Sequence, residues 1–388
     1  MNIVKKSTSV ILLAFVFLIL LPLEAINLLA SSSMSDKSIA TIFLLGLGLP
    51  SFLLAKFLYA GAGKQTLKVT MLGPNGVGKT SLLAAIYDQF DQVIGYTDLQ
   101  LTAENESRKI LEDRLAELKN LVGDKIRVRG GVPGTVEPRE FLFSLGRTGT
   151  TPSALQLRFQ DYPGEYLESE AASKEMKTIK RFMKESAAIL LAIDTPALME
   201  QEGRWHDYIN KPKIVRDLFK EVYQNLDSPR LIILAPVKCE KYVQNAKDAN
   251  ELLRRIKERY ATLLDFFRAS ALEQKVAVVI TPVQTVGSVI FSRVEVNDSQ
   301  PRFYFRKPDP DSPYAPKDSE QPLRYILRFL LRLYIDKQRI PLFDPLLNFL
   351  GKDAALRDAM LNVANGCKNN DSFEVVQGGA LLGITRRN

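Results

Sequence analysis

Residues 73–80 have the sequence GPNGVGKT, in which three glycines precede a lysine and a threonine. Glycines allow the backbone to turn so that successive N–H groups point inward, and such a concave loop binds phosphate. The lysine ammonium can then reach the outer phosphates, and the threonine hydroxyl can bind Mg²⁺. The residues that we expect to contact a nucleotide here are Gly73, Pro74, Asn75, Gly76, Val77, Gly78, Lys79, Thr80 and Ser81.

The flanking segments have the form that this loop requires. Residues 67–72 (LKVTML) alternate in polarity as a strand does, and residues 81–90 (SLLAAIYDQF) are typical of a helix. A helix that begins at the loop adds the positive end of its dipole to the phosphate site. The loop also looks like that of ABC ATPases, but an LSGGQ-type signature and an apolar strand ending in Asp-Glu are both absent from the sequence.

A second group of polar residues follows a predicted strand at residues 154–160, where the sequence DYPG begins with Asp161 and ends with Gly164. A carboxylate at a strand end can hold Mg²⁺ through water, and the glycine N–H can meet the γ-phosphate of a nucleotide. We therefore expect Thr80 and Asp161 at the metal. The next residue, Glu165, stands where related enzymes orient the attacking water, and it could act as a base or repel the γ-phosphate.

A third group, Val237-Lys238-Cys239-Glu240, follows the apolar strand at residues 231–236. In GTPases this position carries [NT]KxD, whose lysine packs over the base and whose carboxylate accepts from guanine N1–H and N2–H₂. The lysine is kept here, glutamate replaces aspartate, and valine replaces the leading residue. We expect Lys238 and Glu240 to bind the base and favour guanine; the alternative is an ordinary charged turn between a strand and a helix.

Five segments together resemble the TRAFAC-class GTPases, and in particular the bacterial double-GTPase family, which shares the DxPGE form: GPNGVGKTSLLAAIYD, LRFQDYPGE, AAILLAIDTPAL, PVKCEKY and ITPVQTVG. The resemblance covers roughly residues 65–335. It implies an α/β fold, a doubly wound P-loop NTPase domain with a mostly parallel sheet and one antiparallel edge strand. It also implies Mg²⁺-dependent GTP binding and a role as a molecular switch.

In such a fold a switch threonine lies just before the strand that pairs with the DxxG strand. The segment at residues 140–145 (EFLFSL) is that strand, and Thr135 precedes it. We expect Thr135 at the metal and, with Lys79 and Glu165, in catalysis. A helix predicted within residues 103–122 either binds a partner or packs on the domain.

Two apolar stretches open the chain, at about residues 9–30 and 39–60, and each is long enough to cross roughly 30 Å of hydrocarbon. Lysines precede the first and follow the second, which places both ends in the cytoplasm. We expect a multi-pass protein of the cell (inner) membrane with its GTPase domain in the cytoplasm. The alternative for the first stretch is a signal peptide.

Three parts follow from these patterns: a membrane anchor with two transmembrane helices at residues 1–64, a P-loop GTPase domain at 65–340, and a C-terminal tail with one helix at 341–388. Of the net charge of +8, residues 1–64 carry +3, and the remaining +5 is too diffuse to indicate nucleic acid. The expected partners are GTP, Mg²⁺, the lipid bilayer and an unidentified protein effector, with a homodimer through the GTPase domain as a further option.

Some features leave alternatives open. The helix predicted at residues 321–336 carries arginines at helical spacing that either pack on the sheet or contact lipid headgroups. Residues 297–321 resemble an exposed loop, and the pair Trp205-His206 is read as loop or lid rather than as catalytic. Two functions fit the whole: a slow GTPase switch, or a scaffold that binds GTP or ATP with little or no hydrolysis.

Overall fold

The computed structural model describes residues 65–384, apart from gaps at 95–97, 122–125, 128–136, 148–154, 171–172, 270, 298–299, 337–343 and 371. Thr135 and both predicted membrane spans lie outside the described residues. The chain from residue 64 onward forms one compact unit by its contacts.

An eight-stranded sheet forms the centre of this unit, in the order β11-β8-β7-β6-β1-β5-β4-β2. Its middle five strands are mutually parallel, as a doubly wound fold predicts. The antiparallel part is larger than predicted, because β4 and β2 close one edge and β11 closes the other. The strands are β1 (Gln65–Leu72), β2 (Leu99–Ala103), β4 (Arg139–Arg147), β5 (Leu155–Asp161), β6 (Ala188–Asp194), β7 (Arg230–Val237), β8 (Val276–Ile280) and β11 (Glu374–Gln377).

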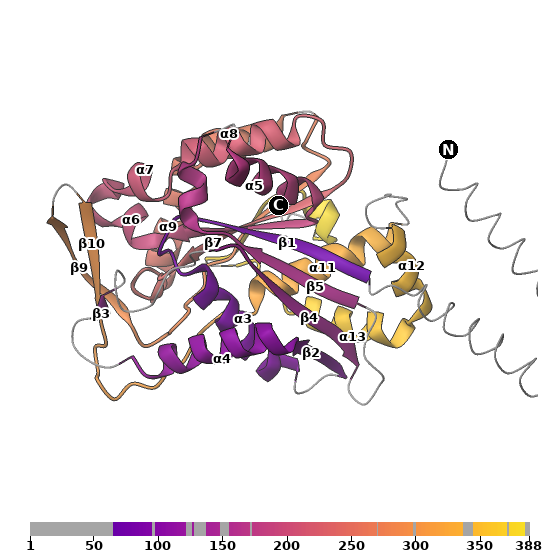
Figure 1. Cartoon of the computed structure of the whole chain (residues 1–388), viewed down its shortest axis with the longest axis horizontal. Helices are drawn as coiled ribbons and strands as arrows, with labels where there is room; N and C mark the ends of the chain where they lie inside the picture. The colour runs from indigo at the N-terminus through magenta and orange to yellow at the C-terminus, as the bar shows by residue number, and fades with distance from the viewer. Residues whose placement is uncertain are drawn as a thin grey trace, which may run out of the picture. The chain divides into compact units, whose positions relative to one another are not determined.

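Helices cover both faces of the sheet (Figure 1). The central strands are buried along their whole length, as in β6, because each face of the sheet faces its own apolar core. One layer contains α3 (Lys79–Ile94), α4 (Asn105–Lys119), α11 (Gln321–Ile335), α12 (Asp344–Lys352) and α13 (Ala354–Ala364). The other contains α5 (Lys174–Glu185), α8 (Pro212–Tyr223), α9 (Ala246–Arg259) and α10 (Ala261–Arg268).

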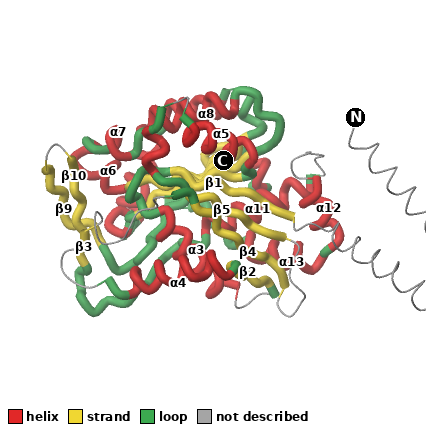
Figure 2. Tube along the Cα trace, in the orientation of Figure 1, coloured by secondary structure: helices red, strands yellow, loops and turns green. Residues whose placement is uncertain are grey.

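The remaining helical segments of the described chain are short, and Figure 2 draws α6 and α7 among them in red. They are α6 (Thr195–Met199), α7 (His206–Ile209) and the 3₁₀ turns η1 (Gly164–Glu168), η2 (Glu200–Gly203), η3 (Glu240–Tyr242) and η4 (Gly379–Leu382).

A second, three-stranded sheet is built from β3 (Ile126–Arg127), β10 (Gln300–Arg306) and β9 (Ile290–Asn297). Phe291 and Phe305 from its two longer strands are buried against the core. The prediction of an exposed loop at residues 297–321 is therefore wrong for residues 300–306. Three aromatic residues are consecutive there, and the register of the strand shifts between Tyr304 and Phe305, both of which are buried.

Two roles were predicted for the arginines of α11: packing on the protein or contact with lipid headgroups. The structure shows that they bind other parts of the protein. Arg324 donates to Val363 O at 2.5 Å, and Arg328 donates to Leu382 O at 2.6 Å. Arg332 pairs with Asp336 at 2.9 Å. The first two guanidinium groups thus bind carbonyl groups at the end of α13 and in η4.

The predicted multi-pass localisation in the inner membrane, with the nucleotide domain in the cytoplasm, is contradicted. Among the described residues between 65 and 384, no helix is both long and apolar enough to cross a bilayer. The longest helix described there, α3, has 16 residues, or about 24 Å at the usual rise. That falls short of the roughly 30 Å of hydrocarbon that a span must cross.

Candidate functional site

The loop between β1 and α3 has the backbone that the glycine spacing predicts. Gly73, Gly76 and Gly78 have φ values of 148°, 68° and 101°, a region that residues with a side chain rarely adopt. A Cβ on Gly73 would also lie 2.8 Å from Ala192 O. Val77 packs its side chain into the core, so only its backbone can face a ligand. The loop is thus folded for binding through N–H groups.

Lys79 lies inside this loop. Its side chain is buried, and its Nζ donates to Gly73 O at 3.2 Å and Pro74 O at 3.4 Å. Burial lowers the pKa of Lys79, while the nearby negative charge of Asp161 acts in the opposite direction. An ammonium group held mainly by neutral carbonyl oxygens is stabilised by an anion that enters the loop.

Thr80 and Asp161 meet next to Lys79. The Thr80 hydroxyl donates to Asp161 Oδ2 at 2.7 Å, and both residues are buried. Asp161 is the last residue of β5 and pairs in register with Met71 of β1, which places it beside the loop. A hydroxyl and a carboxylate oxygen are ligands that suit Mg²⁺. In the described part of the chain, no group of three or more His, Cys, Asp or Glu residues could hold a metal by itself.

The DxxG turn touches the phosphate loop directly. A Cβ on Gly164 would lie 2.0 Å from Asn75 N and 2.3 Å from Pro74 C. Only glycine therefore allows this approach of two backbones. The next residue, Glu165, is exposed and accepts a hydrogen bond from Asn75 Nδ2 at 2.8 Å. The predicted γ-phosphate contact and the predicted catalytic glutamate thus both adjoin the loop.

Lys238 also reaches the phosphate loop, from the end of β7. Its backbone is left-handed, with φ of 58°, and its Nζ donates to Gly76 O at 2.9 Å and to Asp194 Oδ2 at 2.6 Å. The Phe305 ring centroid is 5.9 Å from the same nitrogen. This position beside the loop suits a lysine that packs over a base.

Glu240 is placed differently from what its sequence position suggests. Its Oε1 accepts from Val286 N at 3.1 Å and from Gly287 N at 3.3 Å, which ties it to the TPVQTVG loop. Burial raises the pKa of Glu240, an effect that these N–H groups and Lys238 oppose. One oxygen is therefore occupied by the protein itself, and the second is the one left to meet a base.

Comparison with known families shows which family the chain belongs to. A family model for Double-GTPase 2 matches residues 68–290, more than half of the chain and all the groups described above. The chain belongs to the Double-GTPase 2 family. Membership in the Double-GTPase 2 family supports GTP binding, and it supports a nucleotide hydrolase in general. No curated protein matches the chain significantly.

Several solved structures resemble this Double-GTPase 2 member weakly. The signal recognition particle receptor SRb-GTP/SRX complex from Chaetomium thermophilum is 17% identical, with 57% of this chain and 91% of that chain covered and a TM-score of 0.34. The S. cerevisiae Ski7 GTPase-like domain bound to GTP is 12% identical, with 58% and 44% covered and a TM-score of 0.34. Era in complex with MgGDPNP and 16S ribosomal RNA is 13% identical, with 71% and 70% covered and a TM-score of 0.26.

In this Double-GTPase 2 chain, sequence reasoning missed Asp194 and Asn210, which lie beside the predicted base site. Asp194 ends β6 and pairs with Lys238, and Asn210 follows α7 and binds the backbone of Asp194. An aspartate directly after the apolar run AILLAI was a usable signal, because the carboxyl ends of parallel strands meet at one edge.

His206 lies in the same region and is fully buried, not in an exposed loop or lid. Asn210 Nδ2 lies 3.1 Å from His206 Nδ1, which must accept because the amide nitrogen can only donate. The Tyr260 ring packs edge-on, with centroids 5.3 Å apart. Burial lowers the pKa of His206 to about 4, so the ring is neutral at pH 7.

This pKa predicts an acid-sensitive fold. The unfolded chain, with a histidine pKa of 6.5, binds the proton more readily than the folded chain does. The free energy of unfolding should therefore fall by about 2 kcal/mol between pH 7 and pH 4.5 on account of this group. His206→Gln should remove that component, as urea unfolding at the two pH values would show. Identical pH dependence in the two proteins would contradict the assignment.

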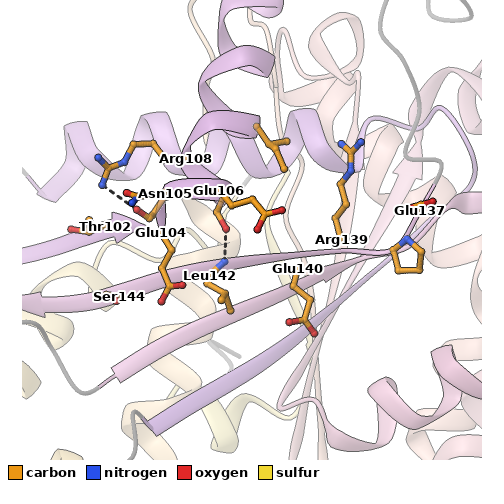
Figure 3. A pocket seen from close by; sticks show the side chains of 14 residues that line it. Thr102, Glu104, Asn105, Glu106, Arg108, Glu137, Arg139, Glu140, Leu142 and Ser144 are labelled. Carbon is orange, nitrogen blue, oxygen red and sulfur yellow. Dashed lines mark hydrogen bonds between the residues drawn. The ribbon is translucent and has the colours of Figure 1, made fainter.

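A cavity of about 1070 Å³ lies at the edge of the sheet, between the start of α4 and β4. Arg139 and Glu140 leave β4 on opposite sides there (Figure 3). Two of its four glutamates accept side-chain hydrogen bonds: Glu104 from Gln156 at 2.8 Å and Glu140 from Gln160 at 3.1 Å. Arg139 pairs in register with Asp161, so this cavity adjoins the candidate metal site.

Proposed function

We propose that this protein is a GTPase switch that binds Mg²⁺–GTP in the loop at residues 73–80 and hydrolyses it slowly. The observation that carries the proposal is the contact of Gly164 with the backbone of Asn75. A turn that senses the third phosphate must lie against the loop that binds the first two. A ligand with a γ-phosphate needs room at that contact, so GTP and GDP should favour different positions of the turn.

Each predicted residue has a role in this proposal. Lys79 neutralises the outer phosphates, Thr80 and Asp161 hold Mg²⁺, and Gly164 meets the γ-phosphate. The ion would supply charge neutralisation across the β- and γ-phosphates. Thr135 remains a predicted metal and catalytic residue outside the described part of the chain.

A second candidate function is a nucleotide-binding scaffold with little or no hydrolysis. It is favoured by the hydrogen bond between Asn75 Nδ2 and Glu165 Oε1, which occupies the carboxylate that would activate water. The deciding experiment measures binding and phosphate release by the full-length protein with GTP and ATP in parallel. Tight GTP binding with phosphate release supports the switch, and tight binding without release supports the scaffold. Absence of binding to either nucleotide contradicts both.

We expect GTP to bind at least tenfold more tightly than ATP, because guanine offers two donors to the second oxygen of Glu240. An unpaired buried polar group costs about 1–3 kcal/mol, which corresponds to about tenfold or more in affinity. Glu240→Gln keeps an acceptor for Val286 and Gly287 but turns a donor toward guanine N1–H. It should lower GTP affinity and leave ATP affinity nearly unchanged in calorimetric titrations.

The matched control is Glu112→Ala, at an exposed position on α4. It should bind both nucleotides as the wild type does. Equal wild-type affinity for GTP and ATP, or an unaltered preference in Glu240→Gln, would refute the role of Glu240 in reading the base.

A further inference from the structure

A buried ion pair joins the end of β6 to the residue after β7. Lys238 Nζ lies 2.6 Å from Asp194 Oδ2, and the two side chains are only 13% and 5% exposed. The strands themselves are in register here, with Asp194 opposite Val237. Because the same ammonium donates to Gly76 O at 2.9 Å, it connects the central sheet to the phosphate loop.

Asp194 is held through both its carboxylate and its backbone. Its Oδ1 accepts from Ala197 N at 3.0 Å and begins α6, while its backbone N–H donates to Asn210 Oδ1 at 2.8 Å. Asn210 Nδ2 donates back to Asp194 O at 3.0 Å and lies within hydrogen-bond distance of His206. Counted as whole residues, with the backbone included, Asp194, Asn210 and His206 are at most 3% exposed. The orientation of Oδ2 is therefore determined by packed, hydrogen-bonded neighbours, as a pre-organised site requires.

We propose that Asp194 is a positioning residue for the nucleobase, which holds Lys238 against the phosphate loop and so controls how fast the nucleotide is released. The inference rests on the proposed function, because only a nucleotide in the loop gives Lys238 a base to cover. A lysine side chain has four rotatable bonds, and the left-handed backbone of Lys238 is unfavourable by itself. When the side-chain rotamers and the backbone conformation of Lys238 are fixed before the nucleotide arrives, binding no longer carries the entropic cost of ordering them.

Asp194 and Lys238 would act on a different part of the base from Glu240. Glu240 offers an acceptor to the edge of the base, so its loss should change the preference between guanine and adenine. Asp194 acts through the lysine that lies over the face of the base, and every purine has such a face. Its loss should therefore accelerate the release of GDP and of GTP alike.

The test uses the full-length protein with Asp194→Asn and measures release of fluorescently labelled GDP and GTP by stopped flow. The asparagine keeps an oxygen to cap α6 but opposes the ammonium with an amide. We expect release to become at least tenfold faster for both nucleotides. Asp194→Ser, which also retains a cap and loses the carboxylate, provides the same test if the asparagine variant folds poorly.

A double-mutant cycle with Lys238→Met separates positioning from a general structural role. If Asp194 acts through Lys238, each single variant should accelerate release, and the double variant should be no faster than the faster single one. Asp217→Asn, at a side chain 60% exposed on α8, is the matched control and should release nucleotide as the wild type does. Unchanged release in Asp194→Asn, or an equal further acceleration in the Lys238→Met background, would overturn the inference. A wild type that binds neither GTP nor GDP would instead overturn the proposed function.

Discussion

Replacing Lys79 with alanine should weaken the binding of Mg²⁺–GTP at least 100-fold while the protein remains folded. The ammonium is the cation inside the phosphate loop, and hydrogen bonds to charged groups contribute about 1.5–3 kcal/mol each. A loss of about 2.7 kcal/mol corresponds to 100-fold in affinity. The fold should tolerate the change because burial already disfavours the charged form of Lys79 in the free protein. Calorimetric titration and thermal unfolding measure the two quantities.

The control for this prediction is Lys220→Ala, at an exposed position on α8. It should bind Mg²⁺–GTP with wild-type affinity. If Lys79→Ala kept its affinity, the assignment of residues 73–80 as the phosphate site would have to be abandoned.

Gly164→Ala should reduce GTP hydrolysis at least 100-fold and change GDP affinity by no more than about threefold. The added Cβ would lie 2.0 Å from Asn75 N, a distance that backbone atoms cannot accommodate, so the DxxG turn must move away from the loop. A displaced turn no longer presents its N–H to the γ-phosphate, and loss of one such donor costs about 10²–10³ in rate. GDP has no γ-phosphate and should be affected little. Single-turnover phosphate release and GDP titration provide the measurements.

Gly351→Ala is the matched substitution, because a Cβ there would meet Tyr334 only at an ordinary 3.7 Å. It should leave both quantities unchanged. A Gly164→Ala protein that hydrolyses GTP normally would show that the contact between the two loops has no part in the reaction. Equal losses of GDP and GTP binding would indicate general damage to the phosphate loop.

Local sequence was sufficient to predict the phosphate loop and the elements around it. Glycine at positions 73, 76 and 78 identifies backbone conformations that other residues avoid, and this preference belongs to the residue itself. The apolar runs of the central strands likewise report burial on both faces, from which a mostly parallel α/β sheet follows. The Thr80–Asp161 contact could be predicted because both side chains stand at strand or loop ends that the fold brings to one edge.

The membrane spans predicted at about residues 9–30 and 39–60 lie outside the described residues. The described helices are too short or too polar to cross a bilayer. The arginines of α11 show why a basic stripe does not identify a lipid contact: carbonyl groups at a helix end recruit the same side chains.

Only the tertiary structure determined which partner each charged side chain around the predicted nucleotide site would take. Glu240 binds the backbone at Val286 and Gly287, Lys238 binds Asp194, and Glu165 binds Asn75. In each pair the residues are 44 or more positions apart, so no local pattern links them. Their contacts depend on strand register and on rotamers chosen by packing, which exist only once the sheet has assembled.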